Sequence, residues 1–531
     1  MNKIEKKITL LEFSDEIFQE IQKYVSINNL LNTTKKLKST KGIRNWKLTK
    51  ESSYKYYIDV DFRQKIISKI KTEKQLYINL SNNTNVIDVD IFKNVYGLNL
   101  HYCVNVIDVS SLGNIHELNL SGCINIIDVS SLGNIHELNL SCCENIIDFS
   151  KLGNSHYLNL TATNIIDVSS LGNVHTLILK YCGNIIDVSK LGKVNCLNLS
   201  NSKIKDVNAL GNVYDLNLMF CKNIIDVSKL GKVHHLNLSF TNIIDVSSLG
   251  NVYCLKLEHC SKIKNVNSLN NVYDLDLTGC RIIDISALKN VYRLKLTCCT
   301  NIINVSSLAN VNTLFLNQCV NIIDVSSLGN VHILDLSYCK GITDVTALGN
   351  VQFLNLAKTN IIDVSALGNV YYLKLRHCKN ITDTSSLINI NSLDLSYCTN
   401  ITDVSTLGNT NNLDLSFCNR ITDVSALGNV RNLNLLGTNI IDVNALGNVY
   451  YLNLVNTPIK DITALGNIVY LNLSGCKNIT DISSLVNVKN LAFLKCDNIT
   501  SLGNMISLDP SYWTGIFNNI TEFYKLNWNN F

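Results

Sequence analysis

The sequence lacks the short motifs that mark most catalytic and cofactor sites. It contains no glycine-rich phosphate-binding loop, no His-Glu-x-x-His zinc motif and no nucleophile elbow. No stretch approaches the 18 consecutive apolar residues of a membrane-spanning helix. The first eleven residues are charged and lack the apolar core of a secretory signal peptide. These absences predict an intracellular protein that is not an enzyme, needs no cofactor or metal and does not enter a membrane.

Cysteine is abundant, at 19 of 531 residues, but no two cysteines have the Cys-x-x-Cys spacing of a zinc knuckle. Asn-x-Ser sequons fall on predicted strands, for example Asn119-Leu120-Ser121, where a glycan would cover the sheet. The first observation gives no support for a zinc site, and the second, together with the missing signal peptide, argues against a secreted disulfide scaffold. We expect buried thiols, with disulfides or a metal site built from stacked thiolates as the alternatives.

One unit is repeated twenty times between residues 98 and 490, opening with Leu-x-Leu and closing near Asp-Val-Ser-x-Leu-Gly-Asn. Thirteen units have 20 residues and seven have 19. A unit this short cannot bury its own apolar face, so successive units must stack into a solenoid. The Leu-x-Leu alternation predicts a strand whose two leucines point inward.

The repeat resembles the leucine-rich repeat pattern L-x-L-x-x-[N/C]-x-L, as in Leu118-Asn119-Leu120-Ser121-Gly122-Cys123. Its Asp-Val-Ser-x-Leu ending is similar to internalin repeats. Its pattern Leu-Ser-x-Cys-x-Asn-Ile-Thr-Asp, as in residues 395–403, is similar to the cysteine-containing repeats of F-box proteins. The resemblance implies an α/β solenoid, a horseshoe or arc with a parallel concave sheet. Units of 19 or 20 residues are too short for a helical return, which favours short 3₁₀ turns or loops on the convex side.

The sixth position of each unit holds Cys in fourteen units and Thr or Ser in the other six. All six hydroxyl units have 19 residues, whereas thirteen of the fourteen Cys units have 20. We expect this side chain to point inward and to bond the backbone of the bend. A hydroxyl is a stronger donor than a thiol, so the two residue types should need different loops.

Two further columns of polar residues invite a metal-site interpretation. Eighteen units carry Asp before Val, Ile, Phe or Thr, and four consecutive units carry His at residues 116, 136, 156 and 175. We expect the aspartates to hold tight turns through backbone N–H groups, and the histidines to be copies of one unit stacked at strand spacing. Calcium binding and histidine–metal binding are the alternatives.

The N-terminal segment resembles the start of an F-box. The residues that fall on the family pattern, and that the resemblance implies as adaptor-binding, are Phe13, Glu16, Ile17, Ile21, Tyr24, Val25, Leu30 and Leu31. The segment departs from the family at Ser14, where F-boxes have proline. The resemblance implies docking to a Skp-family adaptor. The alternative is a helical cap that shields the first coil.

These patterns divide the chain into an F-box-like helical head (residues 1–40), a connector and cap (41–77), the solenoid (78–504) and an aromatic C-terminal cap (505–531). Residues 1–75 carry a net charge of +8 and the remainder a net charge of −4. A nearly neutral solenoid has no basic groove for nucleic acid, so we expect neither nucleic acid nor membrane as a partner.

The variable residues beside the inward leucines should form the concave surface, because strand side chains alternate. Most are small and polar. Two groups differ, and we predict that they bind a partner protein through exposed aromatic and basic side chains. The first group is Phe315, Ile333, Phe353, Tyr372, Lys374 and Arg376, and the second is Leu436, Tyr451, Val455 and Tyr470. Random drift among near-identical copies is the alternative.

Taken with the two resemblances, the sequence predicts a protein-interaction adaptor. The head would dock a Skp-family protein within a cullin ubiquitin ligase, and the concave repeat face would present an unknown target protein for ubiquitin transfer. The alternative is a free-standing leucine-rich-repeat scaffold that binds a host or self protein and uses its N-terminal helices only as a cap.

Overall fold

The computed structural model describes residues 46–70 and 72–501. The F-box-like segment and the aromatic C-terminal cap lie outside these ranges, so their predictions stay predictions. The chain divides between Leu257 and Glu258 into two compact units, which are described separately.

Unit 1 begins with a short strand and two helices that cover the first coil. They are β1 (Trp46–Lys47), α3 (Lys50–Ile58) and α4 (Val60–Ile67), followed by the 3₁₀ turn η2 (Glu73–Gln75) and β2 (Leu76–Asn79). Asp59 ends α3 and caps α4, because its carboxylate accepts the Phe62 N–H at 2.9 Å. The buried Tyr56 ring stacks on Phe92 with centroids 6.2 Å apart, and β1 pairs with β2 in parallel. The sheet therefore starts inside the segment expected to be a connector and cap.

The remaining strands of unit 1 recur once per coil and pair in parallel, each with the next. They are β3 (Gly97–Asn99), β4 (Glu117–Asn119), β5 (Glu137–Asn139), β6 (Tyr157–Asn159), β7 (Thr176–Ile178), β8 (Cys196–Asn198), β9 (Asp215–Asn217), β10 (His235–Asn237) and β11 (Cys254–Lys256). The 3₁₀ turns are η3 (Asp90–Phe92), η4 (Ser110–Leu112), η5 (Ser130–Leu132), η6 (Leu152–Asn154), η7 (Ser169–Leu171), η8 (Asn208–Leu210) and η9 (Ser247–Leu249).

Unit 2 repeats the same arrangement. Its strands are β12 (Asp274–Asp276), β13 (Arg293–Lys295), β14 (Thr313–Phe315), β15 (Ile333–Asp335), β16 (Phe353–Asn355), β17 (Tyr372–Lys374), β18 (Ser392–Asp394), β19 (Asn412–Asp414), β20 (Asn432–Asn434), β21 (Tyr451–Asn453), β22 (Tyr470–Asn472) and β23 (Asn490–Ala492). Its 3₁₀ turns are η10 (Asn267–Asn271), η11 (Ser286–Asn290), η12 (Ser306–Leu308), η13 (Ser326–Asn330), η14 (Thr346–Asn350), η15 (Ser365–Leu367), η16 (Ser385–Leu387), η17 (Leu407–Asn409), η18 (Ser425–Asn429), η19 (Asn444–Asn448), η20 (Thr463–Leu465) and η21 (Ser483–Leu485).

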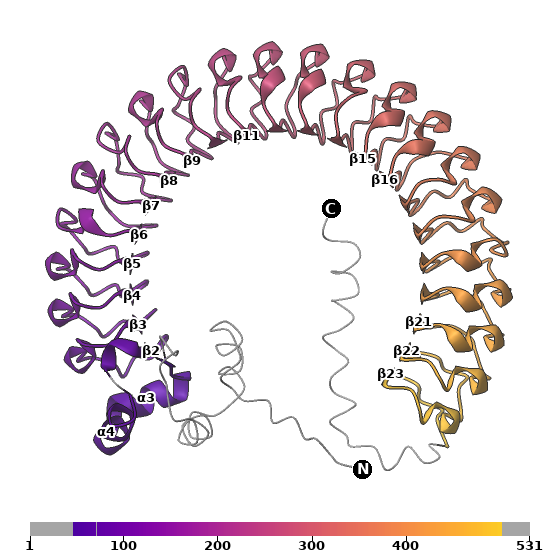
Figure 1. Cartoon of the computed structure of the whole chain (residues 1–531), viewed down its shortest axis with the longest axis horizontal. Helices are drawn as coiled ribbons and strands as arrows, with labels where there is room; N and C mark the ends of the chain where they lie inside the picture. Colours follow the sequence, from indigo (N-terminus) through magenta and orange to yellow (C-terminus); the bar gives the residue numbers. More distant parts are fainter. Residues whose placement is uncertain (1–45, 71, 502–531) are drawn as a thin grey trace, which may run out of the picture. The chain divides into compact units, whose positions relative to one another are not determined.

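Within each unit the opening leucines align across the sheet, as Leu314 does with Leu334. Both leucines of each Leu-x-Leu are buried, and the leucine of each 3₁₀ turn from η4 to η21 is also buried. Figure 1 shows the strands of each unit side by side along one edge of the coils, with the 3₁₀ turns along the opposite edge. The parallel sheet and the short 3₁₀ side are confirmed.

The sixth-position side chains point inward, as expected, but Cys and Thr bond different coils. The Cys103 thiol donates to the Leu80 carbonyl of the preceding coil at 3.1 Å, whereas the Thr163 hydroxyl donates to the Leu160 carbonyl of its own coil at 2.8 Å. The Cys coil also has an extra turn, in which the Val106 N–H donates to the Cys103 carbonyl at 3.1 Å. That turn contains the twentieth residue, so the side chain and the length of the loop change together.

All nineteen cysteines are thiols, and fourteen of them are buried. Burial removes the thiolate from water, and it raises the pKa of the Cys123 thiol to about 12. Only the thiolate reacts quickly with disulfide reagents.

We therefore expect an aromatic disulfide reagent at pH 8 to label at most five thiols of the native protein. The half-buried candidates are Cys142, Cys196, Cys254, Cys298 and Cys496. Mass spectrometry after tryptic digestion identifies the labelled sites, and labelling in guanidinium chloride should reach nineteen. Rapid native labelling of Cys123 or Cys319 would contradict the buried column.

Candidate functional site

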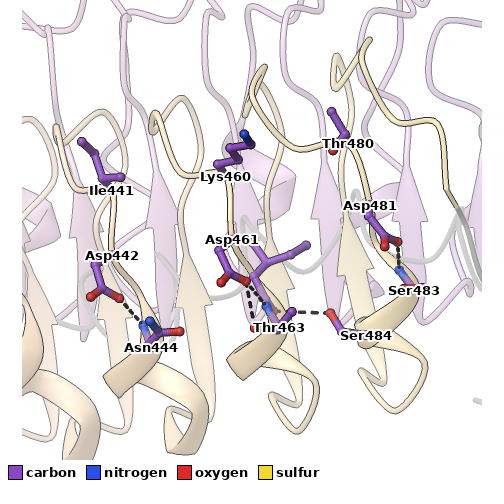
Figure 2. A pocket seen from close by; sticks show the side chains of 11 residues that line it. Ile441, Asp442, Asn444, Lys460, Asp461, Thr463, Thr480, Asp481, Ser483 and Ser484 are labelled. Atoms are coloured by element: carbon purple, nitrogen blue, oxygen red, sulfur yellow. Dashed lines mark hydrogen bonds between the residues drawn. The ribbon is translucent and has the colours of Figure 1, made fainter.

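The aspartate column holds turns, as expected from the sequence. Figure 2 shows three of these aspartates, one per coil, each directed at the turn that follows it. The Asp461 carboxylate accepts the Thr463 N–H at 3.0 Å, and Asp481 accepts the Ser483 N–H at 2.8 Å. These N–H donors lower the pKa of both carboxyl groups. Within residues 46–70 and 72–501, no group of three acidic, His or Cys side chains is arranged to hold a metal ion.

The histidine column is a stack, again as expected. The rings of His116, His136, His156 and His175 follow one another with centroid distances of 4.5, 4.8 and 4.4 Å. Burial, together with the two neighbouring imidazoles, lowers the pKa of His136. In this stack each imidazole packs face to face against the next ring. The column is therefore a packing arrangement of aromatic rings.

A column of exposed apolar side chains was missed by the sequence interpretation. In the recurring Asn-Ile-Ile-Asp segment the first isoleucine is buried and the second faces outward. Ile147 and Ile186 are 85% and 79% exposed. In Figure 2 this column continues as Ile441, Lys460 and Thr480, so the position accepts charged and polar residues as well. The isoleucine is therefore not required by the fold at this position.

The first predicted partner group forms a row on the strand face of unit 2. Ile333, Phe353 and Tyr372 are in register on β15, β16 and β17. The rings of Phe353 and Tyr372 have centroids 6.1 Å apart. Phe315 belongs to the next row, because its register partner is Asp335. The structure thus brings three of the four apolar members of this group into one row.

Tyr372 differs from the expectation, because only 9% of it is exposed. Its ring packs against Phe353, and the Lys374 ammonium lies 5.5 Å from the ring centroid. Burial raises the pKa of Tyr372. Arg376 is exposed, with its guanidinium 4.8 Å from the Tyr397 ring. Arg376, in the turn after β17, is therefore more exposed than Lys374 on the strand, and the buried Tyr372 supports its neighbours.

The second predicted group lies on β20 to β22 and the loops that follow them. Tyr451 and Tyr470 are in register, with ring centroids 6.3 Å apart. Leu436 and Val455 lie in the turns after β20 and β21, where the Gly437 N–H donates to the Val455 carbonyl at 2.8 Å. All four predicted residues are partly exposed.

Between these groups lie two carboxylates that the sequence interpretation missed. Asp394 and Asp414 are in register on β18 and β19 and are 6% and 8% exposed. Asp414 accepts the Asn434 side-chain amide at 3.0 Å. The buried Ser392 and Ser396 hydroxyls on the same strand face as Asp394 have no hydrogen-bond partner. A usable signal was present, since these are the only consecutive units with Asp directly after the opening leucine.

Burial and the neighbouring Asp414 raise the pKa of Asp394, and burial also raises the pKa of Asp414. Arg376 opposes both shifts without cancelling them. The folded protein therefore favours the protonated form of this pair. Ionisation of the two carboxyl groups near neutral pH lowers the free energy of unfolding.

Comparison with known proteins identifies the fold. No protein-family model and no curated protein matches the chain. TLR13, solved with ssRNA13, is 18% identical over 79% of this chain and 76% of that one, with a TM-score of 0.50. Mouse RP105, solved with MD-1, is 15% identical over 75% and 86%, with a TM-score of 0.50. Such identities show the fold alone, and the fold is a leucine-rich repeat solenoid.

No helix within the described residues combines the length and the apolar character needed to cross a lipid bilayer.

Replacing both strand-face aspartates by asparagine should stabilise unit 2. Asparagine can still accept the Ser396 and Ser416 N–H groups that Asp394 and Asp414 bond at 2.9 and 2.8 Å. Because a raised folded-state pKa makes stability fall as pH rises, the gain should be absent below about pH 4 and reach about 1–3 kcal/mol at pH 7. Urea unfolding at pH 4 and pH 7 measures it.

The control is Asp344→Asn, which removes a turn carboxylate whose pKa is lowered by the Thr346 N–H and hydroxyl. It should give no gain that grows with pH. An Asp394→Asn/Asp414→Asn variant with the same pH dependence as wild type would contradict the assignment.

Proposed function

We propose that the protein is a protein-interaction adaptor that binds a target on the strand face of its solenoid and performs no bond chemistry. The observation that carries this proposal is the row of Ile333 and Phe353, which the buried Tyr372 supports, together with the exposed Arg376 in the turn after β17. Aromatic and arginine side chains grouped on an accessible face are typical of interface hot spots. The other conspicuous columns of Cys, Asp and His are engaged in the coils themselves.

The finer proposal is a substrate receptor of a Skp/cullin/F-box ubiquitin ligase, acting inside the cell. It is supported by the resemblance of residues 13–31 to an F-box, followed directly by leucine-rich repeats. A free-standing scaffold whose N-terminal segment is only a cap is the second candidate. The first coil is already covered by β1, α3 and α4, so a further cap is not needed there, and this weighs against the second candidate.

A protein is preferred over a nucleic acid as the target. TLR13 shares the fold and was solved with a single-stranded RNA, whereas RP105 was solved with MD-1. The fold therefore does not decide the class of ligand. Residues 76–531 of this chain carry a net charge of −4, and affinity for nucleic acid comes largely from phosphate contacts by Lys and Arg.

The adaptor role is tested best with point variants in the full chain. Deleting residues 1–60 would also remove β1 and α3, whose Trp46 and Tyr56 are buried in the first coils. We expect wild-type protein to recover Skp-type and cullin subunits, and Ile17→Asp/Leu31→Asp to lose at least nine-tenths of that recovery, because a charge would enter the apolar docking face. Quantitative mass spectrometry of pull-downs reads this out.

The melting temperature of the variant is measured beside that of the wild type, so that a loss of recovery is interpreted only for a folded variant. Absence of Skp-type and cullin subunits from the wild-type sample would favour the scaffold.

The target-binding face is tested by Phe353→Ala/Arg376→Ala. Removing one ring and one cation from a hot-spot row should weaken capture of the target about tenfold or more. The readout is the set of proteins recovered by wild type and lost by the variant. Tyr292→Ala is the matched control, because Tyr292 is 45% exposed and stacks on Tyr273 away from this row. If Phe353→Ala/Arg376→Ala recovers the target as well as Tyr292→Ala does, the prediction that this face binds the target is wrong.

A further inference from the structure

Unit 1 has a recess on its strand face that combines carboxylates with aromatic rings. It encloses about 380 Å³ of space open to solvent. Its floor is formed by Glu117 and Glu137 with the asparagines and leucines of β4 and β5, and its ends by Tyr77 and Tyr157. The row is continuous in register, from Tyr77 on β2 through Gly97, Glu117 and Glu137 to Tyr157 on β6.

Gly97 allows the first aromatic wall to form. A β-carbon at this position would collide with the Tyr77 ring, so the ring lies over the backbone of β3 and toward Glu117. Burial and the negative charges of Glu117 and Glu137 raise the pKa of the Tyr77 hydroxyl. Burial and Glu137 likewise raise the pKa of Tyr157. Both rings are therefore neutral phenols that stand beside the two carboxylates.

Among the described residues, no cation compensates the charge of the two glutamates. Like charges directly opposite on neighbouring strands repel, and neither Glu117 nor Glu137 forms an ion pair with any residue that the structure describes. Lys47 lies 5.2 Å from the Tyr77 ring centroid, but it belongs to β1, on the side of Tyr77 away from Glu117. Burial and the neighbouring His116 and His156 lower the pKa of His136, and this net shift favours its neutral form although Glu137 and Glu117 oppose it.

Two independent features of the recess select the same class of ligand. Carboxylates attract a cation and accept its N–H groups, and phenol rings attract a cation through their faces. We propose that this recess binds a lysine or arginine side chain of a partner polypeptide, with Glu117 and Glu137 accepting its hydrogen bonds and Tyr77 and Tyr157 enclosing it. This inference rests on the proposed protein-binding function and names the chemistry of one contact.

The test uses the full chain and a defined probe, fluorescein-Gly-Lys-Gly-Lys-Gly-amide, followed by fluorescence anisotropy at low salt. We expect Glu117→Gln/Glu137→Gln to weaken binding at least tenfold. Tyr77→Leu and Tyr157→Leu should each weaken it about two- to fivefold. Glu144→Gln is the matched control, because Glu144 is exposed in a loop outside the recess, and it should bind as wild type does.

A probe with both lysines acetylated should not bind, which separates charge recognition from general adhesion. Unchanged melting temperatures show that the variants are folded. Equal binding by wild type and Glu117→Gln/Glu137→Gln, or no binding by wild type, overturns the inference. Either result leaves the adaptor proposal standing if the wild-type chain still recovers Skp-type and cullin subunits, so the two failures are distinguishable.

Discussion

Each coil of this protein can be buried only by its neighbours, and the rest of the structure depends on that constraint. A strand of three residues has too little surface to be stable alone, but its leucines lie in register with those of the adjacent coils, as Leu314 does with Leu334. The backbone is satisfied in the same way, since the Leu316 N–H donates to the Asp335 carbonyl of the next coil at 2.8 Å. Any side chain that disturbs the spacing of coils is therefore costly.

The sixth-position residue shows how this constraint links chemistry to length. A thiol donates weakly and reaches the preceding coil, whereas a hydroxyl closes onto the carbonyl of its own coil, as Cys103 and Thr163 illustrate. In thirteen of the fourteen Cys units the loop has one more residue than a hydroxyl loop has, and that residue lies in the extra turn. Residue type and unit length therefore vary together with the carbonyl that the side chain reaches, and either choice preserves the register of the strands.

This periodicity explains how far the sequence alone could go. Leucine spacing, unit length and the Asp turn each repeat twenty times or nearly so, which made the parallel sheet, the 3₁₀ side and the turn bonds predictable. The strand-face contacts do not repeat. Tyr372 is buried beside Phe353, and Tyr77 lies over Gly97. Both contacts depend on how rings of different coils are oriented, and the sequence of a single unit does not determine this. The Glu117–Glu137 recess was missed for the same reason.

The strand face also shows which residues the fold does not require. Asparagine follows the opening leucine in eleven of the twenty units, and Asn119 accepts the Ser121 N–H at 3.0 Å, which is the same bond that Asp394 makes to Ser396. A charge at this position therefore adds nothing to the turn.

The two carboxylate pairs nevertheless differ in what they offer. Asp394 and Asp414 are buried and bonded to backbone and amide donors, so their charge mainly lowers the stability of their own coils. Glu117 and Glu137 face an open recess between two phenol rings without an ion pair in the described part of the chain. A repulsive pair that is also accessible is relieved when a cation binds. Of the two pairs, the glutamates are therefore the ones whose unfavourable charge can be converted into affinity for a partner.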